Sequence, residues 1–171
     1  ATPLIFTGLA AAVAFRARLW NIGAEGQLYL GAMAAVAIGT GALYISGFFL
    51  LPIIITFGCL MGAFGMVVPM ALKTRFGADE VVTTLLLNFI ILIFLQMMLE
   101  GPLKDPMGLG WPQSAPILDQ GMLPTLLTRM RVHSGLIIGL VLAVILQIFI
   151  NRSIWGFKLR AVGENIFAAR H

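Results

Sequence analysis

An isolated carboxylate is the first residue in this sequence that could do chemistry. Glu25 is the only charged residue between Arg18 and Lys73, and glycines flank it at positions 23 and 26. A charge at the centre of a bilayer costs about 2.5–3.5 kcal/mol on insertion scales, and such residues usually face a cavity or mark a substrate path. In a stretch this apolar, Glu25 therefore indicates a polar path or contact with water.

The two glycines favour a helix break at this point. A break would allow Asn21 or Glu25 to cap a new helix that begins near Gly26, because the N-terminal end of a helix favours a carboxylate. Discontinuous helices of this kind form binding sites in many transporters. The sequence leaves the alternative equally open, which is a plain interfacial turn between two helices with Glu25 in water.

Polar side chains also interrupt the apolar run of residues 81–99. Asn88 and Gln96 lie eight residues apart and project from roughly one helix face, which Thr84 shares with Asn88. Buried amides in a membrane either bond to a neighbouring helix or face a pore, and the first interpretation is favoured for each. We take as candidates for the substrate path Asn21, Glu25, Gln27 and Asn88.

Motifs of hydrolytic, redox and metal chemistry are absent from the sequence. It has no GxxxxGK[ST], no GxSxG and no HExxH, and its two histidines stand at positions 133 and 171. The single Cys59 lies in an apolar run, can form no internal disulfide and is expected to serve packing. No catalytic residue, metal site or cofactor is expected here, and any energy from ATP must come from another chain.

Composition predicts the elements that hold these residues. The chain is 60% hydrophobic and only 11% charged, whereas about a quarter of the residues in soluble domains carry charge. The uncharged runs provide the ~20 residues that a membrane-spanning helix needs and are too uniformly apolar for barrel strands. We predict an all-α, polytopic transmembrane helical bundle with about five helical segments, at residues 1–15, 27–46, 49–72, 81–99 and 134–151. Small residues at four-residue spacing, such as Gly31, Ala35 and Gly39, predict close helix packing.

The distribution of Lys and Arg predicts the orientation. Residues 73–80 and the tail from residue 152 carry six of them, whereas the intervening loop, residues 100–133, carries three, so the first side is predicted to be cytoplasmic. Arg16 and Arg18 join that side if segments 27–46 and 49–72 are both full crossings, and lie elsewhere if segment 27–46 is only a half-helix. The net charge of +4 thus gives no indication of nucleic-acid binding.

The predicted outer loop, residues 100–133, holds five of the eight prolines. Such a stretch resists regular helix and forms a stiff lid, with Trp111 suited to the headgroup level. Docking of an external partner and packing on the protein's own helices are both open interpretations.

The tail from residue 152 mixes aromatic, aliphatic and basic residues. Trp155 and Phe157 are interleaved with Lys158 and Arg160, which is typical of an interfacial stretch against anionic lipid. Gly163 is expected to break the chain, after which Asn165 could cap a short helix. Partner docking and simple membrane anchoring remain equal alternatives for this tail.

Four blocks together resemble a known family. "TPLIFTGLAAAVAFRARLWNIGAEGQLYLGA", "RFGADEVVTTLLLN", "GPLKDPMGLGWPQS" and "WGFKLRAVGENIFAAR" are similar, in that order, to the permease subunits of bacterial ABC importers of the nucleoside type. These belong to a broader family that serves simple sugars and branched-chain amino acids. The resemblance covers nearly the whole chain.

The resemblance implies that residues 1–171 are part of a single transmembrane permease domain truncated at both ends, in a multi-pass protein of the bacterial inner membrane. It implies a cytosolic ABC ATPase that binds the ATP, a second permease subunit and an extracytoplasmic substrate-binding lipoprotein as partners, within membrane lipid. The ATPase-coupling motif would fall on Gly163, Glu164, Asn165, Ala168 and Ala169. Two departures from the family pattern are Ile166, often Pro, and Arg18, frequently Gly.

We therefore expect a permease subunit that translocates nucleosides. The alternatives are a permease for a simple sugar or a branched-chain amino acid and, in another class, an ion-coupled secondary transporter with Glu25 as the titrating group. A purely structural membrane scaffold would have no polar path.

Overall fold

The computed structural model describes residues 2–41, 44–127 and 132–164, and they form two compact units. One unit comprises residues 22–122, and the other comprises residues 1–21 together with 123–171. The candidate path residues Glu25, Gln27 and Asn88 lie in the first unit, whereas Asn21 and the tail belong to the second.

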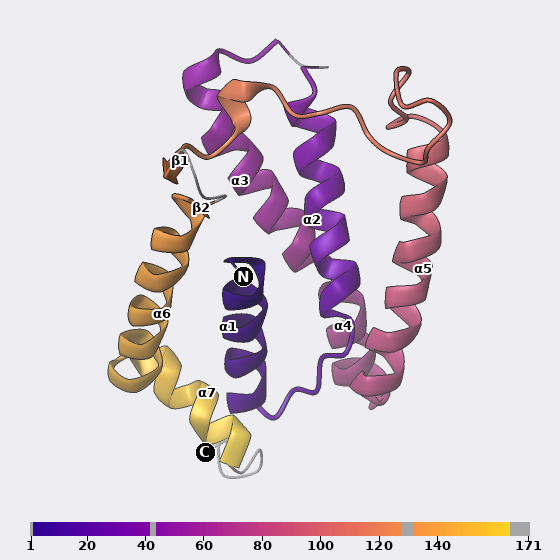
Figure 1. Cartoon of the computed structure of the whole chain (residues 1–171). Helices are drawn as coiled ribbons and strands as arrows, with labels where there is room; N and C mark the ends of the chain where they lie inside the picture. The colour runs from indigo at the N-terminus through magenta and orange to yellow at the C-terminus, as the bar shows by residue number, and fades with distance from the viewer. Residues whose placement is uncertain (1, 42–43, 128–131, 165–171) are drawn as a thin grey trace. The chain divides into compact units, whose positions relative to one another are not determined.

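The unit of residues 22–122 is built on a pair of closely packed helices, α2 (Ala24–Gly39) and α3 (Gly47–Phe64) (Figure 1). A Cβ atom on Gly31 of α2 would lie 2.8 Å from the carbonyl oxygen of Gly58 in α3, so the two backbones meet where both residues lack side chains. Near the other end of the pair, Ile38, Leu50 and Ile54 form the buried core. The expected small-residue packing is thus present.

The predicted segment 49–72 is two helices rather than one. The helix α3 ends at Phe64, and α4 (Val67–Phe76) follows after a two-residue turn. Pro69 explains the interruption, because it has no N–H to donate to the carbonyl of Gly65 four residues earlier and its ring crowds that group. Hydropathy alone could not predict this break, since apolar residues such as Phe64 and Val67 stand directly on both sides of it.

A tight turn joins α4 to α5 (Glu80–Glu100). Gly77 adopts φ 66°, in the left-handed region that favours glycine, and ends α4. Asp79 begins α5 by accepting hydrogen bonds from the N–H groups of Val81 and Val82. A salt bridge of 2.6 Å between Lys73 Nζ and Glu80 Oε1 ties the two helices together, so the charged stretch 73–80 is an ordered helical corner.

The part of the predicted outer loop in this unit has little regular structure, as expected from its prolines. Residues 101–122 contain one short 3-10 turn, η1 (Asp119–Gly121), and a single bridge between Lys104 and Ser114. The loop then packs on the helices of its own unit, because the Leu118 N–H donates to the Gly39 carbonyl at 2.9 Å and Ile117 packs against the core. Trp111, by contrast, is 74% exposed.

The unit of residues 1–21 and 123–171 contains α1 (Thr2–Arg16), a two-stranded antiparallel hairpin and the helices α6 (Gly135–Arg152) and α7 (Ile154–Glu164). The hairpin pairs β1 (Thr125–Leu127) with β2 (Val132–His133). α1 packs on α6 where Gly139 meets Ile5 and Phe6. α7 turns away from α6 and runs toward the C-terminal end of α1 (Figure 1).

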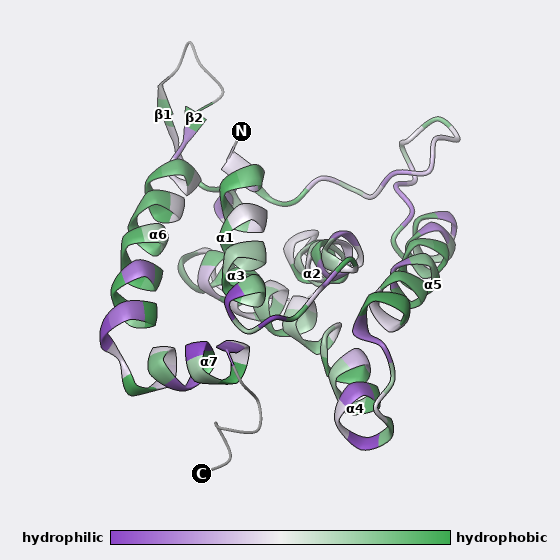
Figure 2. Cartoon of the chain, turned by 90° about the horizontal axis from the view of Figure 1, so that it is seen from below, coloured by the Kyte–Doolittle hydropathy of each residue, from purple (hydrophilic) through white to green (hydrophobic). Residues whose placement is uncertain are grey.

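Within the described residues, three stretches are long and apolar enough to cross a membrane: Gly47–Phe76, Glu80–Glu100 and Gly135–Arg152. Figure 2 shows that hydrophobic residues make up most of α3, α5 and α6. α2 has 16 residues and covers less than the predicted segment 27–46, so it is shorter than the ~20 residues of a full crossing.

Candidate functional site

The residues around Glu25 pack against α5, and backbone N–H groups of this stretch donate hydrogen bonds to α5 side chains. The Ile22 N–H donates to Thr84 Oγ1 at 3.2 Å, and the Gly26 N–H donates to Asn88 Oδ1 at 2.5 Å. Thr84 and Asn88 lie four residues apart and therefore share one face of α5. Both are buried, with 1% and 7% of their surface exposed. We call Ile22, Gly23, Gly26, Thr84 and Asn88 the α2–α5 joint.

Both flanking glycines are required by this close approach. A Cβ atom on Gly23 would lie 2.7 Å from the Thr84 carbonyl oxygen, and one on Gly26 would lie 2.8 Å from Asn88 Oδ1 and 3.0 Å from Ile91 Cδ1. The sequence predicted a helix break here, and α2 does begin at Ala24. The glycines also have a second role that the sequence alone did not indicate, which is to let α5 reach the backbone.

Asn88 acts as a helix cap supplied by another helix. The first N–H groups of an α-helix have no partner within the helix, and a side chain at the N-cap position normally accepts from the second or third of them. In α2 the N-cap position is Gly23, which has no side chain, and Gly26 is the third helical residue. Asn88 Oδ1 accepts a hydrogen bond from the Gly26 N–H, as an N-cap side chain would do. The structure therefore agrees with the interpretation of Asn88 as an interhelical hydrogen-bonding residue. Gln96, for which the same interpretation was favoured, is exposed.

Glu25 lies in the first turn of α2, where the helix dipole favours a carboxylate, and its side chain is exposed. Along α5, Asn88 is eight residues beyond Glu80, so its bond to Gly26 lies about 12 Å from the start of a helix about 30 Å long. α5 is long and apolar enough to cross a membrane.

Gln27 and Asn21 differ in their placement. Gln27 Nε2 lies 3.3 Å from Met66 Sδ, so its side chain reaches the break between α3 and α4. Glu25, Gln27 and Asn88 are thus brought together by one unit. Asn21 stands in the connection between α1 and α2 and belongs to the other unit.

The predicted coupling motif is only partly within the described residues. Gly163 and Glu164 end α7, whereas Asn165, Ala168 and Ala169 lie outside the described part of the chain. The described part of α7 ends at Glu164, one residue beyond the chain break expected at Gly163, and the expected helix after Asn165 lies outside the described residues. Gly163 lies against the end of α1, where a Cβ atom would collide with the Arg16 carbonyl oxygen.

Arg18 is a residue whose importance the sequence reasoning missed. It adopts φ 51° and so terminates α1 in the left-handed conformation, while the Leu19 N–H donates to the Ala14 carbonyl at 3.0 Å. This conformation strains a residue with a Cβ and suits glycine. The frequent glycine at this position in the resembled family was the available signal.

The apolar helices of the described residues, long enough to cross a membrane, define a multi-pass integral membrane protein. Its family follows from comparison with known proteins. A model of the family described as "Branched-chain amino acid transport system / permease component" matches residues 1–171, and the chain belongs to this family. No solved structure matches the chain.

Several curated relatives align with nearly all of the chain. The guanosine ABC transporter permease protein NupP of Bacillus subtilis is 38% identical over 99% of this chain and 49% of its own length. The glucose ABC transporter permease protein TsgB13 of Haloferax volcanii is 34% identical over 99% and 47%. The nucleoside ABC transporter permease protein NupB of Lactococcus lactis is 30% identical over 99% and 48%. The chain therefore spans about half the length of these relatives.

Proposed function

We propose that the chain is part of the permease subunit of an ATP-driven importer that translocates nucleosides. The observation that carries this proposal is the 38% identity to a guanosine permease over 99% of the chain. A second relative named for nucleosides, at 30% identity, supports the same substrate class.

The substrate path passes the start of α2. An exposed carboxylate in the first turn of a helix that begins inside the membrane is suited to accept hydrogen bonds from the hydroxyl groups of a sugar ring, and Glu25 takes that role. Gln27 and Asn21 are the further path residues. Asn88 contributes by positioning, because its Oδ1 already holds the Gly26 N–H.

A cytosolic ATPase binds at the segment from Gly163 to Ala169 and supplies the ATP-binding site, so this chain holds no cofactor of its own. The contact of Gly163 with the end of α1 supports this role. A push on this end of α7 would displace Arg16, from which the chain continues through residues 17–23 to Glu25. A second permease subunit and an extracytoplasmic substrate-binding lipoprotein complete the importer.

A simple sugar is the second candidate substrate, because the glucose permease of Haloferax volcanii is 34% identical. The test is uptake of labelled guanosine, adenosine and glucose by the full-length permease, reconstituted in liposomes with its ATPase and lipoprotein. We expect nucleoside uptake that requires ATP and that excess unlabelled glucose leaves unchanged. Matched liposomes whose ATPase cannot hydrolyse ATP are the control. Uptake of glucose but not of nucleosides would show that the substrate is a simple sugar. Uptake driven by an ion gradient without ATP would refute the proposal of an ATP-driven importer.

A further inference from the structure

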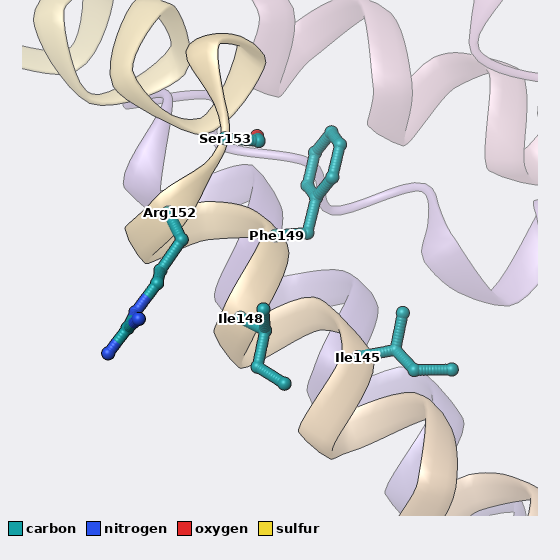
Figure 3. Close-up of a pocket in the computed structure, with 5 residues that line it drawn as sticks. All are labelled: Ile145, Ile148, Phe149, Arg152 and Ser153. Carbon is teal, nitrogen blue, oxygen red and sulfur yellow. The ribbon is translucent and has the colours of Figure 1, made fainter.

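The buried polar side chains lie at the α2–α5 joint. Within the described residues, the polar side chains that are buried are those of Thr84 and Asn88. The pocket on α6 offers no comparable group, because three of its five lining residues are apolar and the Arg152 side chain extends away from Ser153 and Phe149 (Figure 3). A polar group buried in a membrane protein is costly unless it has a partner or a function, so a role for Thr84 beyond packing is expected.

Hydrogen bonds at the joint hold the backbone on both sides of Glu25. Upstream, Thr84 Oγ1 accepts from the Ile22 N–H at 3.2 Å. Downstream, Asn88 Oδ1 accepts from the Gly26 N–H. The two acceptors lie one turn apart on α5, so a single helix face fixes both ends of the segment. The position of the Glu25 backbone therefore depends on both acceptors.

The two acceptors act on different parts of the chain. Gly26 lies inside α2, and its N–H belongs to the first turn, which every helix must cap. Ile22 precedes α2, so its N–H has no acceptor in that helix. The contact is close at the next residue too, because a Cβ atom on Gly23 would lie 2.7 Å from the Thr84 carbonyl oxygen. Asn88 therefore stabilises the helix end, whereas Thr84 fixes where the chain enters the helix.

The Thr84 hydroxyl is oriented by its own helix. It donates to the Glu80 carbonyl at 2.6 Å, and its oxygen lies 3.2 Å from the Val81 carbonyl oxygen. A hydroxyl has one proton to donate, so its lone pairs are left to accept from the Ile22 N–H. Glu80 is held in turn by Lys73, whose Nζ lies 2.6 Å from Glu80 Oε1. The corner between α4 and α5 thus orients the acceptor that holds Ile22.

We propose that Thr84 is a positioning residue for solute transport and acts through Glu25. Its hydroxyl fixes the backbone at Ile22, three residues before Glu25, and so holds the exposed carboxylate where it meets the solute. This proposal rests on the proposed function, which gives Glu25 that contact. Loss of the Thr84 hydroxyl should displace the carboxylate without removing it, so the variant should resemble Glu25→Gln in transport.

Hydrogen exchange at the Ile22 amide tests the anchor without any transport. The full-length permease in nanodiscs is compared with Thr84→Val, which keeps the shape of the side chain and loses the hydroxyl, and with Thr84→Ser, which keeps the hydroxyl. We expect exchange at Ile22 to be about threefold faster in Thr84→Val, the factor that corresponds to an average interhelical hydrogen bond in a membrane. Exchange in Thr84→Ser should equal that of the parent protein. Thr84→Ala replaces Thr84→Val if the valine variant does not insert.

Uptake tests whether the anchor acts through Glu25. In liposomes that hold the complete importer, Thr84→Val should lower the maximal rate of ATP-dependent uptake about threefold, and Thr84→Ser should keep the parent rate. In a Glu25→Gln background, Thr84→Val should have almost no further effect, because the carboxylate that it displaces is gone. A purely structural defect would instead lower the rate by the same factor in both backgrounds.

Thr83→Val is the matched control for both measurements. The Thr83 hydroxyl donates to the Asp79 and Glu80 carbonyls at the start of its own helix, so its loss should change neither exchange at Ile22 nor uptake. Unchanged exchange at Ile22 in Thr84→Val would overturn the proposal whatever the uptake. An unchanged uptake rate, or an equal loss in both backgrounds, would overturn the positioning role alone. Absence of ATP-dependent uptake by the parent protein would refute the proposed function, and the positioning role would fall with it.

Discussion

Replacing Asn88 by leucine tests whether this side chain holds the start of α2. The substitution keeps a side chain of similar size and removes the acceptor that lies 2.5 Å from the Gly26 nitrogen. A buried donor left without a partner costs about 1–3 kcal/mol, whereas hydrogen bonds between membrane helices contribute about 0.6 kcal/mol on average and up to about 1.7. Because this bond also caps a helix that has glycine at its N-cap, we expect Asn88→Leu to lower the free energy of unfolding by about 1–2 kcal/mol.

The measurement is equilibrium unfolding of the full-length permease in mixed micelles. Gln96→Leu is the matched control, because this amide lies on the same helix but is exposed, and its replacement should change stability by less than about 0.5 kcal/mol. Equal effects of the two substitutions would refute the capping role. Loss of uptake with unchanged stability in Asn88→Leu would instead indicate that Asn88 contacts the substrate directly.

Three further substitutions test other parts of the structure. Arg18→Gly should raise the free energy of unfolding by about 0.5–1 kcal/mol, because glycine relieves the strain at φ 51°; a lower value would contradict the left-handed turn. Gly163→Ala should reduce ATP-dependent uptake because its Cβ displaces the Arg16 carbonyl, whereas Gly8→Ala on α1, which has open space, should be neutral in the same assay. Glu25→Gln should lower uptake without lowering the free energy of unfolding, since the side chain is exposed; normal uptake would show that Glu25 has no role in transport.

The sequence predicted best those helices whose ends carry charge or caps. Segments 81–99 and 134–151 correspond closely to Glu80–Glu100 and Gly135–Arg152. Asp79 starts the former and Arg152 ends the latter, so hydropathy and end chemistry agree there. Segments 27–46 and 49–72 were less accurate, because their ends depend on how Gly and Pro act inside apolar runs. Pro69 interrupts one such run without changing its hydropathy.

The joint itself could be predicted only in part. The sequence identified Asn88 and Thr84 as polar residues on one helix face and favoured an interhelical bond for Asn88. It could not identify the partners, because Ile22 and Gly26 lie 62 residues earlier and the pairing depends on how α2 and α5 pack. Helical spacing fixes which side chains share a face, and tertiary packing decides what that face meets.

The joint also bears on how a chain this apolar could keep the Glu25 carboxylate. Ile22 and Gly23 form non-helical backbone about 6 Å or more along α5 from Glu80, and irregular backbone within a membrane is tolerated only where it is buried in protein or lines a cavity. On one side, Thr84 and Asn88 accept from this region's N–H groups. Glu25 is exposed on another side, and contact with lipid at the bilayer centre would cost about 2.5–3.5 kcal/mol. We therefore propose that this side faces further protein or water, which is the condition a solute path requires.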